Sequence, residues 1–141
     1  MTPQDALTTL LNWLRNRYGS EYQTISLAYY PTWELEGVEQ LNQKVMLVSP
    51  GNWTWSGLER QGTKSIWEAE IHITVFAPCN VKNIGEVSAL LKSVNSLAKA
   101  VLACEDLAVS SVNVNPSVDL AASEGARHFT ATLTCSVVGA E

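Results

Sequence analysis

Three residues with side chains suited to acid–base or metal chemistry stand on one face of a predicted strand. In the segment IWEAEIHITVFA, residues 66–77, Glu68, Glu70 and His72 alternate with apolar residues, so their side chains project to the same side. Two carboxylates and an imidazole in a row can bind a metal ion or act as acid and base. No further ligand follows at a useful spacing, so we favour a solvated strand face whose charges pair with a neighbouring strand. The only other histidine is His128, at the entrance of another predicted strand.

The three cysteines suggest a second chemistry, that of a thiolate nucleophile. Cys79, Cys104 and Cys135 are odd in number and widely spaced, without the paired spacing of a zinc or redox site, so we expect buried, reduced thiols. Cys104 falls at the end of a predicted helix, where the dipole disfavours a thiolate, and Cys135 falls on the inward face of a strand. Cys79, just ahead of a helix start, is the one candidate nucleophile, and it would still need a positioned base. The chain also lacks the GxSxG, GxxxxGK[ST] and GxGxxG patterns, so we expect no enzyme activity, no cofactor and no bound metal.

The segment SPGNWTWSGLERQGTKSIW, residues 49–67, places tryptophans among turn-forming residues. Trp53 and Trp55 stand two apart, so in an extended arm both rings lie on one face and can dock onto a partner surface. Leu58 and Arg60 extend this candidate interface, since arginine is favoured at protein interfaces. The alternative is that the arm folds back and its rings cover the core of the same chain.

Composition limits the classes of protein to which the chain can belong. Its 141 residues, 46% hydrophobic and 16% charged, fit one globular domain over residues 1–141. The formal net charge is −5 and the nine basic residues are scattered, which disfavours nucleic-acid binding. The sequence shows neither a signal peptide nor an apolar run near the ~18 residues of a membrane span. We therefore expect no membrane association, and a protein made in the cytoplasm.

Hydrophobic periodicity predicts two long helices and about five strands. The helices are expected over residues 3–18 and 84–103, and the strands over residues 24–31, 44–48, 66–77, 107–114 and 127–139. The strand over 44–48 is expected to end at the SPG turn and the strand over 107–114 before Pro116. Because the strands follow one another mostly without helical crossovers, we predict an α+β fold. It has a single mostly antiparallel (mixed) β-sheet of about 4–6 strands, with residues 66–77 central, two long α-helices packed on one face and a protruding β-hairpin arm.

This layout resembles the tail terminator and tail-completion proteins of long-tailed bacteriophages and related contractile particles. The resemblance lies in the opening amphipathic helix, in KVMLVSPG followed by the arm, and in LERQG leading into IWEAEIHITVFAP. It continues in the helix EVSALLKSVNSLAKAVL and in the closing strand HFTATLTCSVVG, and covers essentially the whole chain.

The resemblance implies a structural protein of the virion tail or neck, assembled in the cytoplasm of a bacterial host. It implies a homo-oligomeric ring, a hexamer, that caps the tail tube protein, ends tail polymerisation and joins the head connector protein. It also implies no catalytic residue and no cofactor, and it would make Trp53, Trp55, Leu58 and Arg60 contacts to a neighbouring subunit or to the tail tube. Two other classes stay open: a non-viral protein-binding module or adaptor, and a small cysteine- or metal-dependent enzyme.

Overall fold

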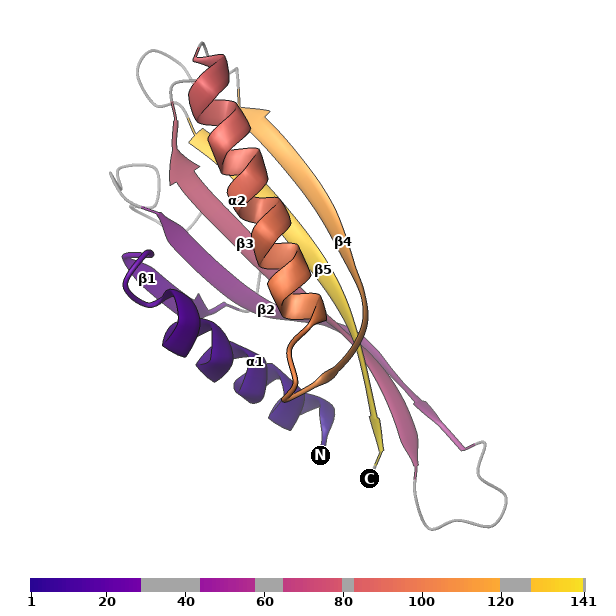
Figure 1. The fold of residues 1–141 in the computed structure, drawn as a ribbon. Helices are drawn as coiled ribbons and strands as arrows, with labels where there is room; N and C mark the ends of the chain where they lie inside the picture. The colour runs from indigo at the N-terminus through magenta and orange to yellow at the C-terminus, as the bar shows by residue number, and fades with distance from the viewer. Residues whose placement is uncertain (29–43, 58–64, 80–82, 120–127, 141) are drawn as a thin grey trace.

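The computed structural model of the chain describes residues 1–28, 44–57, 65–79, 83–119 and 128–140. Two helices and five strands follow one another in the predicted order (Figure 1). They are α1 (Pro3–Tyr18), β1 (Thr24–Leu27), β2 (Val45–Ser56), β3 (Ile66–Pro78), α2 (Ile84–Leu102), β4 (Ala108–Asp119) and β5 (His128–Ala140).

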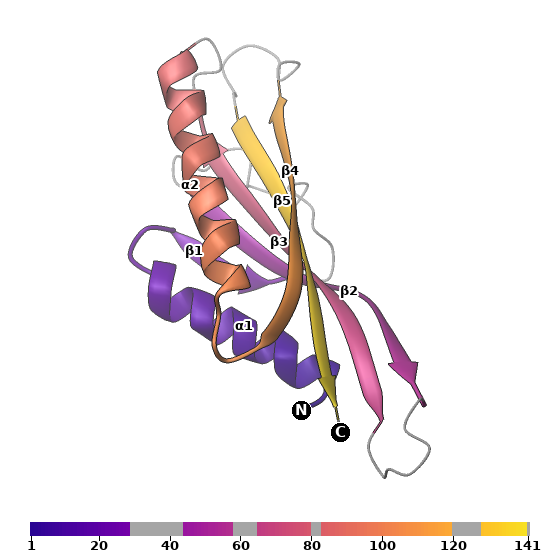
Figure 2. The ribbon, with the colours of Figure 1, turned by 45° about the vertical axis from the view of Figure 1, so that its right-hand side comes forward.

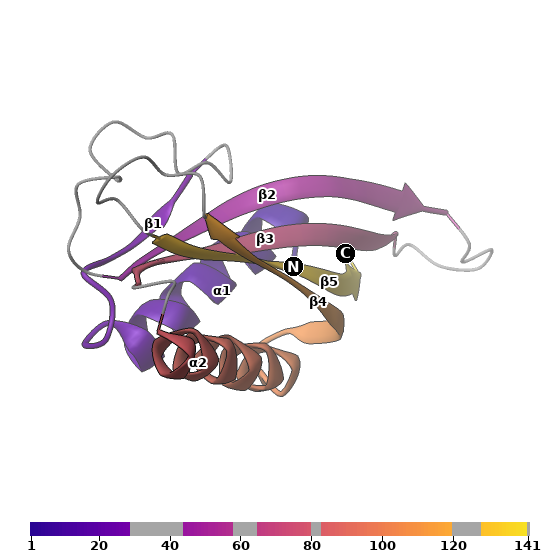
Figure 3. The same ribbon diagram turned by 90° about the horizontal axis from the view of Figure 1, so that it is seen from above.

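The strands form one mixed sheet in the order β1-β2-β3-β5-β4, so β3 is central as predicted. β1 runs parallel to β2, and the other neighbouring pairs are antiparallel. Both helices cover the same face of this sheet (Figure 3). α1 contacts β1, β2 and β3, whereas α2 contacts β4 and β5. The α+β fold with two helices on one face of a mixed sheet is thereby confirmed.

Side-chain hydrogen bonds fix where the helices begin. At α1 the Thr2 hydroxyl accepts from the Asp5 backbone N–H at 3.1 Å, and the Asp5 carboxylate accepts from the Thr2 N–H at 2.9 Å. This reciprocal capping box also lowers the pKa of Asp5, chiefly through the backbone hydrogen bond. At α2 the side chain of Asn83 accepts from the N–H groups of Gly85 and Glu86.

The core lies between the helices and one face of the sheet. The alternation predicted for residues 66–77 is confirmed in β3, and β5 shows the same pattern; the helix-side residues of both strands are all nearly inaccessible to solvent. They are Trp67, Ala69, Ile71, Ile73 and Val75 from β3, and Phe129, Ala131, Leu133, Cys135 and Val137 from β5. The opposite face, which we call the open face, is not polar throughout. Val45, Leu47 and Phe76 are buried there in a second cluster with Ala28 beside them.

The strand predicted over residues 44–48 is longer than expected. β2 continues to Ser56, with one extra residue bulged out between the pairs Pro50–Ile71 and Trp53–Ala69. β1 pairs with β2 only as far as Val48, so the following part of β2 is an edge, where proline is tolerated. The predicted end of this strand at the SPG turn was therefore wrong.

β4 likewise continues past its predicted end before Pro116. It pairs with β5 as far as Asp119, and Pro116 lies opposite Ala131. Because β4 is the last strand of the sheet, a missing N–H can face away from β5 without breaking the ladder. β1 is shorter than the predicted strand over 24–31 and ends at Leu27; the rest of that prediction, from residue 29, lies outside the described residues.

The arm is a β2–β3 hairpin, as predicted, that runs past the N-terminus of α1 (Figure 2). The described part of the arm is stabilised more than an isolated two-stranded ribbon would be. β5 pairs with β3 all the way to the pair Ile66–Ala140, so three strands run along it. A third strand supplies the backbone pairing that an isolated hairpin lacks.

Candidate functional site: the hairpin arm

Trp53 and Trp55 lie on the helix-side face of the arm. In the β2–β3 register Trp53 is opposite Ala69 and Trp55 is opposite Trp67, and residues directly opposite in a ladder share a face. Ala69 and Trp67 belong to the buried face of β3. The bulge after Pro50 is what places the two tryptophans on this side.

The two rings are only partly covered by the described residues. Trp53 is 45% exposed and Trp55 is 46% exposed, whereas Trp67, on the same face of the next strand, is 0% exposed. The difference comes from two neighbours of Trp67 that are distant in sequence. The Trp67 indole N–H donates to the Met1 carbonyl at 2.8 Å, and its ring lies over Gly139, so neighbours cover it on two sides. The alternative, in which the rings of Trp53 and Trp55 cover the core of the same chain, stays open, because about half of each ring is covered within the chain.

The remaining predicted interface residues, Leu58 and Arg60, lie outside the described residues. Nothing therefore places them beside Trp53 and Trp55, and their part in the interface stays a prediction. The two tryptophans form the part of the candidate site that the structure brings together.

Glu68, Glu70 and His72 do share the open face of β3, as predicted. His72 shares a hydrogen bond of 3.2 Å between its Nδ1 and the Thr134 hydroxyl of β5. Its Nε2 lies against the backbone of Gly51, where a Cβ would approach it to 2.8 Å. Within the ranges of the chain that are described, no three His, Cys, Asp or Glu side chains gather closely enough to hold a metal ion. His72 is thus held by contacts with both neighbouring strands.

All three cysteines are buried and unpaired by disulfides. Burial raises the pKa of the Cys79 thiol, and Glu86 raises it further, although Asn83 begins a helix close by. Burial raises the pKa of Cys135 to about 12. A raised pKa lowers the thiolate fraction at neutral pH, which is the opposite of what a nucleophilic cysteine needs.

This environment predicts slow thiol chemistry. In the folded protein Cys79 should react with iodoacetamide at pH 7.5 more slowly than a free thiol, by about tenfold or more, and the rate should rise with pH above the ordinary cysteine range. Mass spectrometry of timed samples measures the rate, with urea-unfolded protein as the reference. Labelling of Cys79 at pH 6 as fast as in the unfolded chain would contradict this prediction.

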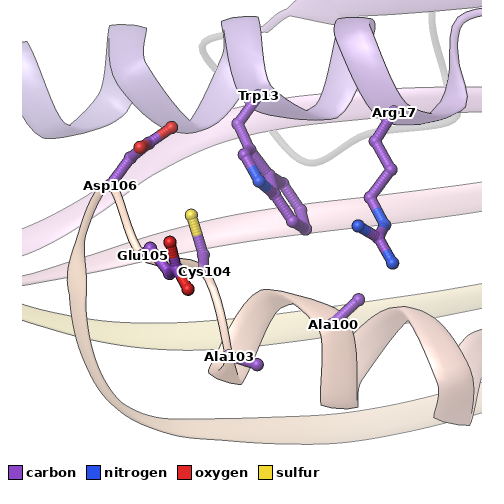
Figure 4. A pocket seen from close by; sticks show the side chains of 7 residues that line it. All are labelled: Trp13, Arg17, Ala100, Ala103, Cys104, Glu105 and Asp106. Carbon is purple, nitrogen blue, oxygen red and sulfur yellow. The ribbon is translucent and has the colours of Figure 1, made fainter.

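A shallow cleft of about 330 Å³ lies between α1 and the end of α2 (Figure 4). Its lining consists of Trp13, Arg17, Ala100, Ala103, Cys104, Glu105 and Asp106. The Arg17 guanidinium lies over the Trp13 ring at 5.5 Å from its centroid. None of the described residues that line the cleft is a histidine, so none of them could serve as base for Cys104.

No family model matches the chain, and a search among curated proteins finds none similar to it.

Among the residues whose structure is described, neither helix is long and apolar enough to cross a bilayer. The arm with its two half-exposed tryptophans is therefore the candidate site that the geometry supports best.

Proposed function

We propose that this chain is a structural tail-completion protein that forms a ring, a hexamer, on the end of a phage-type tail tube. In this role it ends tube polymerisation and provides the joint to the head connector. The proposal combines the sequence resemblance with a fold of the class that the resemblance implies.

The observation that carries the proposal is the arm. It is a projecting strand pair with two large apolar rings on one face, each nearly half exposed. Tryptophan is enriched at the centres of protein interfaces, so two such rings exposed on one face suit a contact with another protein. An assembly protein requires a binding site for another protein. It does not require a catalytic site.

Capping a polymer also sets a physical requirement. The cap must match the last ring of the tube on one face without presenting a copy of that surface on the other. In a ring around a lumen through which DNA passes, negative charge discourages DNA from sticking. The formal net charge of −5 suits such a position.

Electron microscopy of particles made without this chain tests the proposal. We expect tubes of uncontrolled length that lack heads, with normal length restored when the wild-type chain is supplied from a plasmid. Light scattering of the purified protein should show a species of several subunits. Tails of normal length in its absence would contradict the function, and a protein that stays monomeric would favour a binding module or adaptor instead.

A further inference from the structure

β4 is an edge strand that lacks the charged side chains by which most edge strands are protected against pairing. It ends the strand order, and no described strand lies on its outer side. From residue 108 to residue 118 its sequence, AVSSVNVNPSV, contains no charged residue. Edge strands of monomeric proteins usually carry charges, because their unpaired backbone groups can pair with other chains. A bulge after Val109 and the proline at 116 leave a regular run, residues 111–115, between them.

The flank of α2 beside this edge is apolar and exposed. Ile84, Leu91 and Leu102 are 83%, 42% and 49% exposed, and their spacings of seven and eleven residues place them along one side of the helix. The sheet-facing side of α2 holds Val94, Leu97 and Val101. Ala100 and Ala103 face the cleft toward α1. The exposed flank is therefore the side of α2 away from α1, next to β4, the strand that α2 contacts most.

The arm offers another free edge of the same sheet, beyond the point where β1 ends. β1 leaves β2 at Val48, so no described strand pairs with the outer side of residues 53–56. This segment, WTWS, is also uncharged. Its tryptophans face the helix side, as the register with Ala69 and Trp67 shows.

We propose that the arm strand, residues 53–56 of one copy, pairs with the β4 edge of a second copy and continues its sheet. The inference rests on the proposed function, since it names the surface that receives the arm within the ring. If the helix-side faces of the two sheets join into one, Trp53 and Trp55 of the first copy lie on the helix side of β4 of the second copy. There they meet Leu91 and Leu102 on the exposed flank of α2, and both sets of apolar side chains are covered together.

Because the tryptophans and the flank of α2 lie on the same face, the arm of a second copy suits the β4 edge better than a symmetrical pairing of two β4 edges does. Two β4 edges paired about a twofold axis would form a closed dimer and would leave both tryptophans exposed. Pairing of arm to β4 uses two different surfaces of each copy, so every copy has one free surface of each kind. Such a head-to-tail contact repeats and gives a ring when the rotation closes.

Disulfide trapping between two singly substituted proteins tests the contact. Thr54 lies on the open face of the arm, and Ser111, Asn113 and Asn115 lie on the open face of β4. Cross-strand neighbours have Cβ atoms about 4.5–5.5 Å apart, close to the reach of a disulfide. Thr54→Cys protein is mixed with Ser111→Cys, Asn113→Cys or Asn115→Cys protein under mild oxidation. We expect one of the three mixtures to give a heterodimer on a non-reducing gel.

Two proteins serve as controls for the trapping, and a double variant with a control of its own tests the apolar contact. Wild-type protein reports on its buried cysteines, and Ser96→Cys places a thiol on an exposed part of α2 away from the flank. The double variant Leu91→Ser/Leu102→Ser should raise the concentration of half-assembly about tenfold or more without changing the monomer's melting temperature. Val138→Ser, at an exposed apolar position on the open face, should leave assembly as in the wild type.

The outcomes separate this inference from the function on which it rests. Rings that form normally, with no heterodimer and with unchanged assembly of the leucine variant, would overturn the inference and leave the ring intact. Disulfide-linked pairs of Asn113→Cys protein alone would overturn it in favour of twofold β4 pairing. A chain that is monomeric at every concentration would overturn both the inference and the ring.

Discussion

Replacing both exposed tryptophans, Trp53→Ala/Trp55→Ala, should weaken ring assembly at least about thirtyfold while the monomer still folds. The two side chains are 45% and 46% exposed. About 100 Å² of each therefore remains to be covered by a partner, and at ~25 cal/mol per Å² the pair would contribute about 5 kcal/mol before ordering costs.

The cost to the monomer is smaller, because only the covered half of each ring contributes there. We expect a loss of about 1–2 kcal/mol in the free energy of unfolding, measured at a concentration where the protein is monomeric. Sedimentation velocity over a dilution series gives the assembly constant for each variant. Thr54→Ala, between the two rings and on the opposite face, is the matched control and should assemble as the wild type does.

The opposite pattern would identify a different role for these rings. If the double variant unfolds at low concentration, Trp53 and Trp55 serve the fold of the monomer. If its oligomeric ring is as stable as that of the wild type, the two tryptophans do not form the interface. The candidate site would then have to be sought elsewhere on the surface.

Periodicity predicted the parts of the fold in which burial repeats regularly along the chain. Both helices begin at the predicted residues, and the inward faces of β3 and β5 are as expected. In these elements the alternation of apolar and polar residues reports directly which side is covered. Local sequence is sufficient there because each element has one buried side.

The strand ends at Pro50 and Pro116 were not predictable in the same way. Proline lacks the backbone N–H that a neighbouring strand would need. Whether it ends a strand therefore depends on whether a strand lies on that side, and this is decided by the order of strands in the sheet. β1 stops pairing at Val48 and β4 has no described neighbour beyond it, so both prolines lie in edges. The clue in the sequence was the lack of charge around them, which becomes informative only once the edges are known.

Which of the three tryptophans of the arm is buried could not be predicted from the sequence either. Trp53, Trp55 and Trp67 share one face, and nothing in their spacing distinguishes the buried ring from the exposed pair. Trp67 is covered through Met1 and Gly139, which are distant in sequence. Burial of a ring by remote segments is a property of the assembled fold.

This packing of Trp67 leads to the largest expected effect on stability. Its side chain is 0% exposed, its indole N–H donates to the Met1 carbonyl at 2.8 Å, and its ring lies directly over the Gly139 backbone. Trp67→Ala would leave a large cavity and an unpaired carbonyl, so we expect a loss of about 3–5 kcal/mol in the free energy of unfolding. Since whole domains of this kind are stable by about 5–15 kcal/mol, this loss removes a large share of the stability and should lower the melting temperature by several degrees or more.

We expect the stability of the fold to depend on Gly139 because the Trp67 ring lies against it, and not because this position needs the backbone freedom of a glycine. A Cβ at this position would lie 2.6 Å from Cε2 of Trp67 and closer still to Cζ2, so Gly139→Ala forces the ring or the strand to shift. Overpacking of this kind costs about 1–3 kcal/mol. Removing the ring removes the clash, so the double variant Trp67→Leu/Gly139→Ala should be less destabilised than the sum of its two single variants. Urea denaturation of the four proteins gives this coupling energy, and additive losses would show that the contact between the Trp67 ring and the β5 backbone does not hold the base of the arm together.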